Sequence, residues 1–334
     1  DCRFEHIYRK SLYYMASPNY QSSPIIRDND FGNDNFTLIG SYDSATTPEI
    51  TGNTSSSNIT LENVNAGSTI SSNTFSGVTL TDVDPDLSIS SNTFTGSVPV
   101  NLNDSPLASF SNNSYPNARR INVTGDVSKD TIWSNIDGMD LPYHIYSETT
   151  VIHSGVTLTI EAGVVVKFDA SDYDENTHCM IVDGILNLQS TASDPIVFTS
   201  DRDDSYGGDS NGDGTSTSPT TDDWGYIRID NGDNVIHDCI FRYGGEKQDG
   251  DTAHDYMLWI NNCSATVEDC RFENGYQYAL YYYATQNYDS DPKIENNYVD
   301  AVSQVQATVV GSPGFEDGIV GSAYAGDVDS YLTF

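Results

Sequence analysis

Positive charge is scarce in this sequence. The 334 residues include 14 Lys and Arg against 49 Asp and Glu, which gives a formal net charge of −35 at pH 7 and a pI of about 4.1. So acidic a chain would repel a phosphate backbone, which argues against nucleic acid as a partner. The acidity keeps a secreted protein soluble and attracts divalent cations. Adaptation to high salt would produce the same composition.

Long apolar runs are also missing. No stretch approaches the roughly 20 apolar residues that a membrane-spanning helix needs, so the sequence predicts no membrane span. The chain begins at Asp1 with strand-like residues, without an initiator Met or a signal-peptide pattern. We interpret it as a processed product or a fragment.

Asp, Ser, Thr, Asn and Gly are abundant, a mixture typical of short strands joined by polar turns. Within it a pattern recurs: an aliphatic residue, two polar residues, Asn or Cys, any residue, and an aromatic residue. The copies lie 19 to 31 residues apart where they follow one another, as expected for one solenoid turn each. Their Asn or Cys residues are Cys2, Asn29, Asn53, Asn73, Asn92, Asn113, Cys239, Cys270 and Asn297.

The pattern predicts an all-β fold, a β-solenoid of short parallel strands stacked about 4.8 Å apart. The aliphatic and aromatic residues would point inward and stack. The Asn at each bend would pair its amide with the Asn above and below, and Cys would replace it as a small buried residue. The alternative is that Asn marks turns in unrelated hairpins. Hairpins would show Asn-Gly turns about 8 to 12 residues apart, and this sequence does not.

The sequence also contains a longer repeat, which spans many copies of the short one. Residues 1–5 return as residues 269–273, and 16 of the first 31 aligned positions are identical. The sequence therefore predicts tandem modules of about 268 residues. Residues 1–118 would be the last turns of one module, and residues 119–334 most of the next.

The second module opens with a series of predicted strands, in which residues 156–168 alternate apolar side chains on either side of an Ala-Gly corner. Further apolar strands follow at residues 184–188, 195–200 and 224–229. In the order of these blocks, residues 130–242 resemble the secreted right-handed parallel β-helix proteins with a pectin-lyase-like fold, above all the non-enzymatic repeat proteins of bacterial and archaeal cell surfaces. The resemblance implies a right-handed parallel β-helix and an extracellular setting. It implies no reaction, because this fold hosts many functions.

The densest group of candidate ligands is the loop from residue 201 to 223. Asp209-x-Asn211-x-Asp213-Gly214 matches the first half of a calcium loop, in which alternate oxygen ligands face one point. Thr220 stands where an EF-hand would have its bidentate Glu. The missing carboxylate would come from the base of the loop, from Asp203, Asp204, Asp222 or Asp223. We expect a structural Ca²⁺, the alternative being a solvated acidic loop.

Enzymatic activity is the weaker hypothesis. The paired carboxylates at 203–204 and 222–223 would suit general acid and base catalysis, but both pairs lie in the calcium-like loop. A polyanionic substrate would be repelled by the net charge. The histidines are scattered and predict no metal pair; they are His6, His144, His153, His178, His237 and His254.

Tyrosines form a second candidate surface. Tyr13 and Tyr14 occupy places equivalent to Tyr281 and Tyr282 in the long repeat, and Tyr283 follows. Alternate members of such a run must point outward from a strand. They would contact glycans or a partner, or they would form a stacked ladder that stiffens the solenoid.

Two modifications are left open by the sequence. Cys239 and Cys270 share a place in the short repeat, so they would form a disulfide or two stacked buried thiols; no Cys-x-x-Cys pair suggests zinc or redox chemistry. Seven sequons are candidates for N-glycosylation, namely Asn35, Asn53, Asn58, Asn103, Asn112, Asn122 and Asn262.

These observations predict an exported structural protein. Solenoid modules in series build length rather than a pocket, and a further module or a copy of the chain would cover each end. The sequence therefore favours a segment of an extracellular filament or cell-surface appendage that contacts copies of itself end to end. The alternatives are a surface adhesin or glycan-binding stalk and, less favoured, a polysaccharide lyase or hydrolase.

Overall fold

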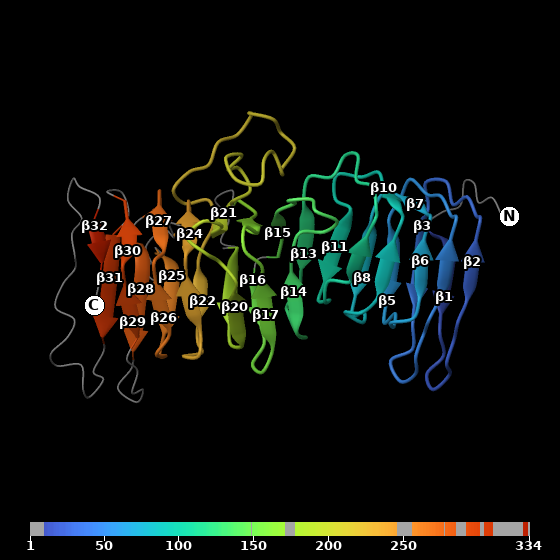
Figure 1. Cartoon of the computed structure of the whole chain (residues 1–334), viewed down its shortest axis with the longest axis horizontal. Coiled ribbons are helices and arrows are strands. Elements are labelled where there is room, and N and C mark those ends of the chain that lie inside the picture. Colours follow the sequence, from blue (N-terminus) through green and yellow to red (C-terminus); the bar gives the residue numbers. More distant parts are fainter. Residues whose placement is uncertain are drawn as a thin grey trace. The chain divides into compact units, whose positions relative to one another are not determined.

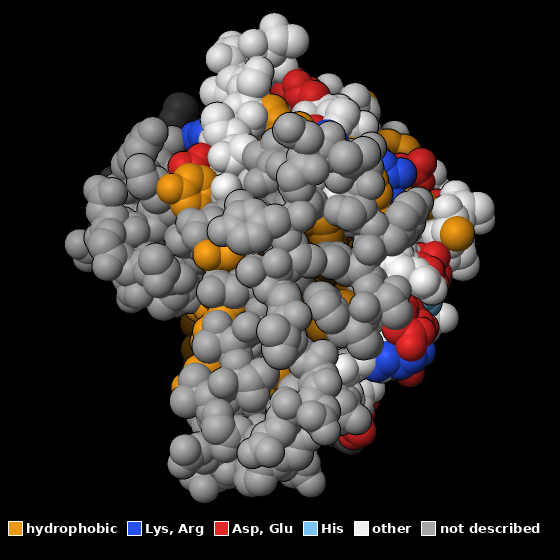
Figure 2. All heavy atoms as spheres, turned by 90° about the vertical axis from the view of Figure 1, so that its left-hand side faces the viewer, with side chains coloured by type: hydrophobic (Ala, Val, Ile, Leu, Met, Phe, Trp, Pro, Cys, Tyr) orange, Lys and Arg blue, Asp and Glu red, His pale blue; other side chains and the backbone are white. Residues whose placement is uncertain are grey.

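The computed structural model describes residues 10–147, 149–170, 178–245, 256–276, 278–284, 292–300, 304–309 and 330–332. Every regular element in these ranges is a β-strand, which confirms the all-β class. No helix in the described ranges is long and apolar enough to cross a membrane. Acidic side chains are prominent on the described surface in Figure 2, with few Lys and Arg beside them.

The chain forms two compact units. The first comprises residues 1–124 and 135–141, and the second comprises residues 125–134 and 142–334. This division is spatial. The repeat-based modules, residues 1–118 and 119–334, remain a prediction.

The strands of the first unit lie in three parallel sheets, and strands that follow one another in the chain enter different sheets (Figure 1). One sheet contains β1 (Lys10–Met15), β3 (Asn35–Ile39), β5 (Ile59–Glu62), β8 (Val78–Thr81), β11 (Val100–Asn103) and β13 (Ile121–Thr124). The second contains β2 (Ile25–Arg27), β4 (Glu49–Thr51), β6 (Thr69–Ser71), β9 (Ser88–Ser90) and β12 (Ser109–Ser111). The third pairs β7 (Thr74–Phe75) with β10 (Thr93–Phe94).

The alternation of buried and exposed side chains along the strands explains why the strands stack in register. In β5 the side chains of Ile59 and Leu61 are buried, and they lie in register with the buried Val78 and Leu80 of β8. Because successive side chains of a strand point to opposite faces, one face of each strand fills the interior and the other meets solvent.

The second unit repeats the arrangement with four sheets. The first contains β15 (Tyr143–Ile145), β18 (Val165–Phe168), β21 (Ile196–Ser200), β24 (Cys239–Arg242), β27 (Arg271–Glu273) and β30 (Asn297–Val299), with β32 (Ser330–Leu332) antiparallel to β30. The second contains β16 (Thr149–Ile152), β19 (Cys179–Val182), β22 (Ile227–Ile229), β25 (Tyr256–Asn261), β28 (Tyr278–Ala284) and β31 (Gln304–Val309). Two short sheets contain β14 (Thr131–Trp133), β17 (Thr157–Ile160) and β20 (Ile185–Leu188), and β23 (Val235–His237), β26 (Thr266–Glu268) and β29 (Lys293–Glu295).

Stacked aromatic rings fill part of this interior. Phe198, Phe241 and Phe272 lie on neighbouring strands with ring centroids 5.1 and 4.9 Å apart. Such a ladder of identical side chains follows from parallel strands in register. The long parallel sheets of both units are consistent with the predicted β-solenoid.

In the neighbouring strands β15, β18 and β21, side chains on both faces are buried. The long loop that follows β21 covers the outer face; it is the yellow loop above β21 and β24 in Figure 1. Lys167 shows the contact: its side chain is fully buried, and Nζ donates to the carbonyl oxygens of Asp203 (3.0 Å) and Gly208 (2.8 Å). The loop is therefore packed onto the sheet at its base.

Candidate functional site

Two buried aspartates anchor the loop of residues 201–223. Asp203 accepts hydrogen bonds from Thr199 Oγ1 (2.8 Å) and from Arg242 Nη1 (2.7 Å). Burying a carboxylate is expensive unless a cation and hydrogen-bond donors accompany it. The guanidinium and the hydroxyl supply both here, so Asp203 has a structural role at this position.

Asp223 forms the second anchor in the same way. Its carboxylate accepts from Ser200 Oγ at 2.5 Å, from Thr220 Oγ1 at 2.6 Å and from Arg202 Nη1 at 3.2 Å. Both carboxylates were candidate calcium ligands and candidate acid–base groups. Their pairing with arginines supports loop anchoring instead, because a cation or a substrate would have to displace these partners.

The centre of the predicted calcium loop is a compact turn. Asp209 accepts from the backbone N–H groups of Gly212 (2.8 Å) and Gly214 (3.3 Å), and Asn211 Oδ1 accepts from the backbone N–H of Asp213 (3.3 Å). Gly212 and Gly214 have φ of 83° and 71°, the left-handed region that glycine adopts without strain. The structure thus brings Asp209, Asn211 and Asp213 into one turn. The calcium itself stays a prediction.

The remaining two acidic candidates of the loop are half-buried. Asp204 has one carboxylate oxygen, Oδ1, that is buried and makes no hydrogen bond within the described residues. Asp222 lies directly before the anchor Asp223. Neither residue faces an arginine in a described ion pair, so these two could still contribute oxygen ligands.

The asparagines of the short repeat meet in a continuous ladder in the first unit. Asn53 Oδ1 accepts from both the backbone N–H and Nδ2 of Asn29, each at 3.0 Å. Asn53 in turn donates from the same two groups to Asn73 Oδ1, at 2.9 and 3.0 Å. The same contacts join Asn73 to Asn92 and Asn92 to Asn113.

Each ladder amide also holds its own turn. Asn73 Nδ2 donates to the carbonyl of Ser71 (3.0 Å) and to that of Ile50 in the preceding turn (2.8 Å). The last ladder member, Asn113, donates to Asp137, whose carboxylate also accepts from the Tyr115 hydroxyl at 2.7 Å. Burial, together with this hydrogen bond, raises the pKa of Tyr115. A row of fully hydrogen-bonded amides thus replaces solvent at the bend.

Cysteine takes the same place in the second unit. Cys270 Sγ donates to the carbonyls of Glu268 (3.3 Å) and Ile236 (3.5 Å), the same two relative positions that the ladder amides use. The Cys270 N–H donates to Asn297 Oδ1 at 3.0 Å. Cys239 and Cys270 are both free thiols, so of the two alternatives the structure has the thiols. Cys2 lies outside the described residues.

Outward aromatic residues gather on the outer face of β22, β25 and β28. Tyr281 stacks on Tyr256 with ring centroids 4.7 Å apart, and Arg228 lies 5.2 Å from the ring centroid of Trp259. Tyr282 is fully buried between its outward neighbours, as strand alternation requires. In the first unit Tyr13 is 48% exposed, and Tyr14 is half-buried. Stacking and surface exposure therefore occur in the same set of tyrosines.

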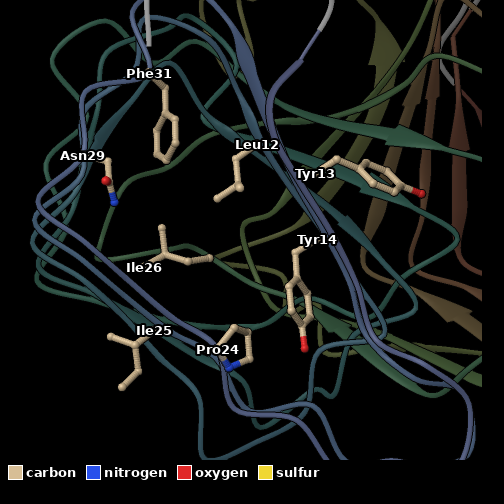
Figure 3. A pocket seen from close by; sticks show the side chains of 8 residues that line it. All are labelled: Leu12, Tyr13, Tyr14, Pro24, Ile25, Ile26, Asn29 and Phe31. Atoms are coloured by element: carbon tan, nitrogen blue, oxygen red, sulfur yellow. The ribbon is translucent and has the colours of Figure 1, made fainter. Parts of the chain in front are cut away.

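An open pocket lies at the edge formed by β1 and β2, with a volume of about 310 Å³. Figure 3 shows Leu12, Ile26 and Phe31 facing its hollow, while Tyr13 points away. The other lining residues are Tyr14, Pro24, Ile25 and Asn29. The pocket is the uncovered end of the apolar interior of the first unit, as far as the described residues show it.

One further group of side chains has no counterpart among the sequence motifs. The sequence predicts no histidine pair for a metal, but in the folded chain Asp169 lies close to both His144 and His178, at 3.5 and 3.9 Å. Asp201 completes the cluster, 3.9 Å from His144. Sequence reasoning missed this cluster, because its residues are separated in sequence and only the register of β15, β18 and β21 brings His144, Asp169 and Asp201 together.

The sequons differ in access. Asn53 is fully buried in the ladder, where a folded chain has no room for a glycan. The other six sequon asparagines are exposed or half-buried.

Family models, curated proteins and solved structures were compared with the chain, and none of them matches it.

Proposed function

We propose that the chain is a structural segment of an extracellular filament or cell-surface appendage. In this proposal the fold is a right-handed parallel β-helix of the pectin-lyase-like kind, built from modules of about 268 residues. The modules stack end to end, so that each open edge receives another solenoid turn. The support comes from the pocket at β1 and β2.

The internal repeat indicates what belongs in this pocket. Shifting the pocket residues by one repeat places Leu12 at Leu280, Tyr14 at Tyr282 and Ile26 at Ile294. Leu12 and Tyr14 are half-buried, whereas Leu280 and Tyr282 are 2% and 0% exposed. The same side chains are thus fully covered in the second copy and only partly covered in the first.

The cover in the second copy is the preceding turn of chain. Leu280 and Tyr282 lie in register with Leu258 and Ile260 of β25, and Ile294 lies in register with Val267 of β26. A turn of this shape would fill the pocket at β1 and β2 and pair with the edge of β1. Among the described strands, β1 pairs with β3 alone, and the apolar pocket lies beside its other edge. Such an edge is a surface suited to strand addition.

We expect the edge to take a second copy of the chain. The wild-type protein should sediment as species larger than the 36.5 kDa single chain and increase in size with concentration. Leu12→Asp places a charge in the pocket and should leave single chains. Ile132→Asp, at a position of β14 that is 52% exposed, is the matched control and should assemble like the wild type.

Negative-stain electron microscopy of the same samples gives the second readout. Regular fibres in the wild type and in Ile132→Asp, but not in Leu12→Asp, would support the proposal. Single short particles at every wild-type concentration would refute it, as would unchanged fibres of Leu12→Asp.

The aromatic face favours an adhesin as a second candidate function. Trp259 and Tyr281 are half-buried aromatic side chains whose ring centroids lie 6.2 Å apart, and such side chains can pack on sugar faces. A glycan array probed with the wild type and with Tyr281→Ala tests this function. Glycan binding that is lost in the variant would favour the adhesin. An array without any binding would exclude the adhesin and leave the filament segment as the remaining proposal.

A further inference from the structure

The cluster of His144, Asp169 and Asp201 is assembled by three neighbouring strands. His144 is the central residue of β15, Asp169 directly follows β18, and Asp201 directly follows β21. The backbone fixes the two aspartates, because Asp169 N–H donates to the carbonyl of Ile145 (3.1 Å) and Asp201 N–H donates to that of Phe168 (2.9 Å). His178 approaches from the residue before β19. The sheet thus positions three side chains that can each donate a lone pair, and His178 lies beside Asp169.

His144 is the unusual member. Its side chain is 1% exposed, and neither Nδ1 nor Nε2 makes a hydrogen bond within the described residues. A buried polar group without a partner costs free energy, and such groups are rare in folded proteins. The imidazole nevertheless points at the two carboxylates rather than at solvent, so a missing partner between them would explain its position.

The distances suit a metal ion better than direct hydrogen bonds. His144 Nε2 lies 3.5 Å from Asp169 Oδ1 and 3.9 Å from Asp201 Oδ2, and His178 Nε2 lies 3.9 Å from Asp169 Oδ2. In the trio of His144, Asp169 and Asp201, the ligand atoms all lie within 4.8 Å of one another. Ligands bound tetrahedrally at about 2.0–2.1 Å stand roughly 3.3–3.5 Å apart. A small ion at the centre would draw the ligand atoms of the trio closer together, and His178, which lies outside the trio, would move toward the ion.

The charges around the cluster also favour a bound cation. The neighbouring cationic side chains have other partners: Lys167 donates to backbone carbonyls of the loop, and Arg202 pairs with Asp223. A divalent ion would neutralise both carboxylates.

We propose that His144, His178, Asp169 and Asp201 bind one divalent first-row transition-metal ion. Imidazole and carboxylate together select Zn²⁺ and its neighbours, whereas Ca²⁺ prefers oxygen ligands alone. Four protein ligands leave no open coordination position, which is typical of a structural site. The ion would tie β15, β18 and β21 to the start of β19. This site is distinct from the Ca²⁺ site predicted for the acidic loop of residues 201–223.

The test is titration of the metal-stripped full chain with ZnCl₂, followed by calorimetry in the presence of excess Ca²⁺. We expect one tight site per chain that Ca²⁺ does not displace. His144→Ala and Asp201→Asn should each weaken this site by at least about 100-fold. His153→Ala is the matched control, because His153 is an exposed histidine that also faces an aspartate, Asp126, at 2.9 Å.

The absorption spectrum of bound Co²⁺ gives a second readout, which reports the coordination geometry in the wild-type chain. Co²⁺ bound to the wild-type chain should show the intense visible absorption of tetrahedral coordination, and Zn²⁺ should displace it. Tight one-to-one binding with this spectrum, lost in Asp201→Asn, supports the site. Weak binding of several Zn²⁺ ions that is unchanged in Asp201→Asn would overturn it and leave His144 as an imidazole paired directly with the aspartates.

Discussion

The asparagine ladder makes a quantitative prediction for Asn73→Ala. Asn73 is 2% exposed and lies in the middle of the ladder. Its oxygen accepts from two groups of Asn53, and its Nδ2 donates to Ile50 O, Ser71 O and Asn92 Oδ1. Removing the amide leaves some of these groups with other partners, since Asn53 Nδ2 also donates to Ile26 O and Thr51 O. The backbone N–H of Asn53 bears the largest loss, because Asn73 Oδ1 is the acceptor that it uses.

Each buried group left without a partner costs about 1–3 kcal/mol. One such group predicts a loss of about 1–3 kcal/mol in the free energy of unfolding, a sizeable share of the 5–15 kcal/mol typical of a domain. Asn73→Cys should cost less than Asn73→Ala. Its thiol can donate to the carbonyls, as Cys270 does, although it supplies no good acceptor. Asn103→Ala, at an exposed position of β11, should cost less than about 0.5 kcal/mol.

Urea unfolding followed by tryptophan fluorescence and by circular dichroism measures these differences. Hydrogen exchange at the Asn53 amide adds a local readout that does not require a two-state transition. The ladder reasoning would be refuted if Asn73→Ala were as stable as Asn103→Ala, or if the Asn53 amide stayed equally protected in both.

Two further predictions concern thiols and calcium. In a Cys2→Ser chain, Ellman's reagent at pH 8 should label no thiol until the protein is unfolded, because burial raises the pKa of Cys263 and Cys270 and keeps them protonated; rapid labelling of the native chain would contradict this. The buried thiols are Cys179, Cys239, Cys263 and Cys270. Adding Ca²⁺ to the metal-stripped chain should raise its melting temperature and slow proteolysis within residues 201–223. Asp209→Ala should abolish both effects, and an equal response of this variant would remove the loop as the site.

Much of the fold could be predicted because the stacking of parallel strands leaves a direct trace in the sequence. Asn53, Asn73 and Asn92 occupy one spatial row, so the same residue type recurs once per turn. Alternation likewise predicts that Tyr282 points inward between two outward tyrosines.

The contacts of the loop could not be predicted in the same way. The sequence suggests Asp203 and Asp223 as ligands of a calcium loop. In the structure they pair with Arg242 and Arg202, respectively. The cluster around His144 was also missed, since its residues belong to different turns without a common spacing. Turn lengths vary in this unit, so the register across β15, β18 and β21 has to be seen in the structure.

The asparagine ladder has a direction. From Asn29 to Asn113 every amide-to-amide hydrogen bond is donated by the earlier turn to the later one, and Asp137 accepts the last of these donors. A stack continued through such a row would have chemically different ends, so its subunits would join head to tail rather than through a two-fold axis. Such an assembly would be a polar fibre able to lengthen at one end while the other stays attached.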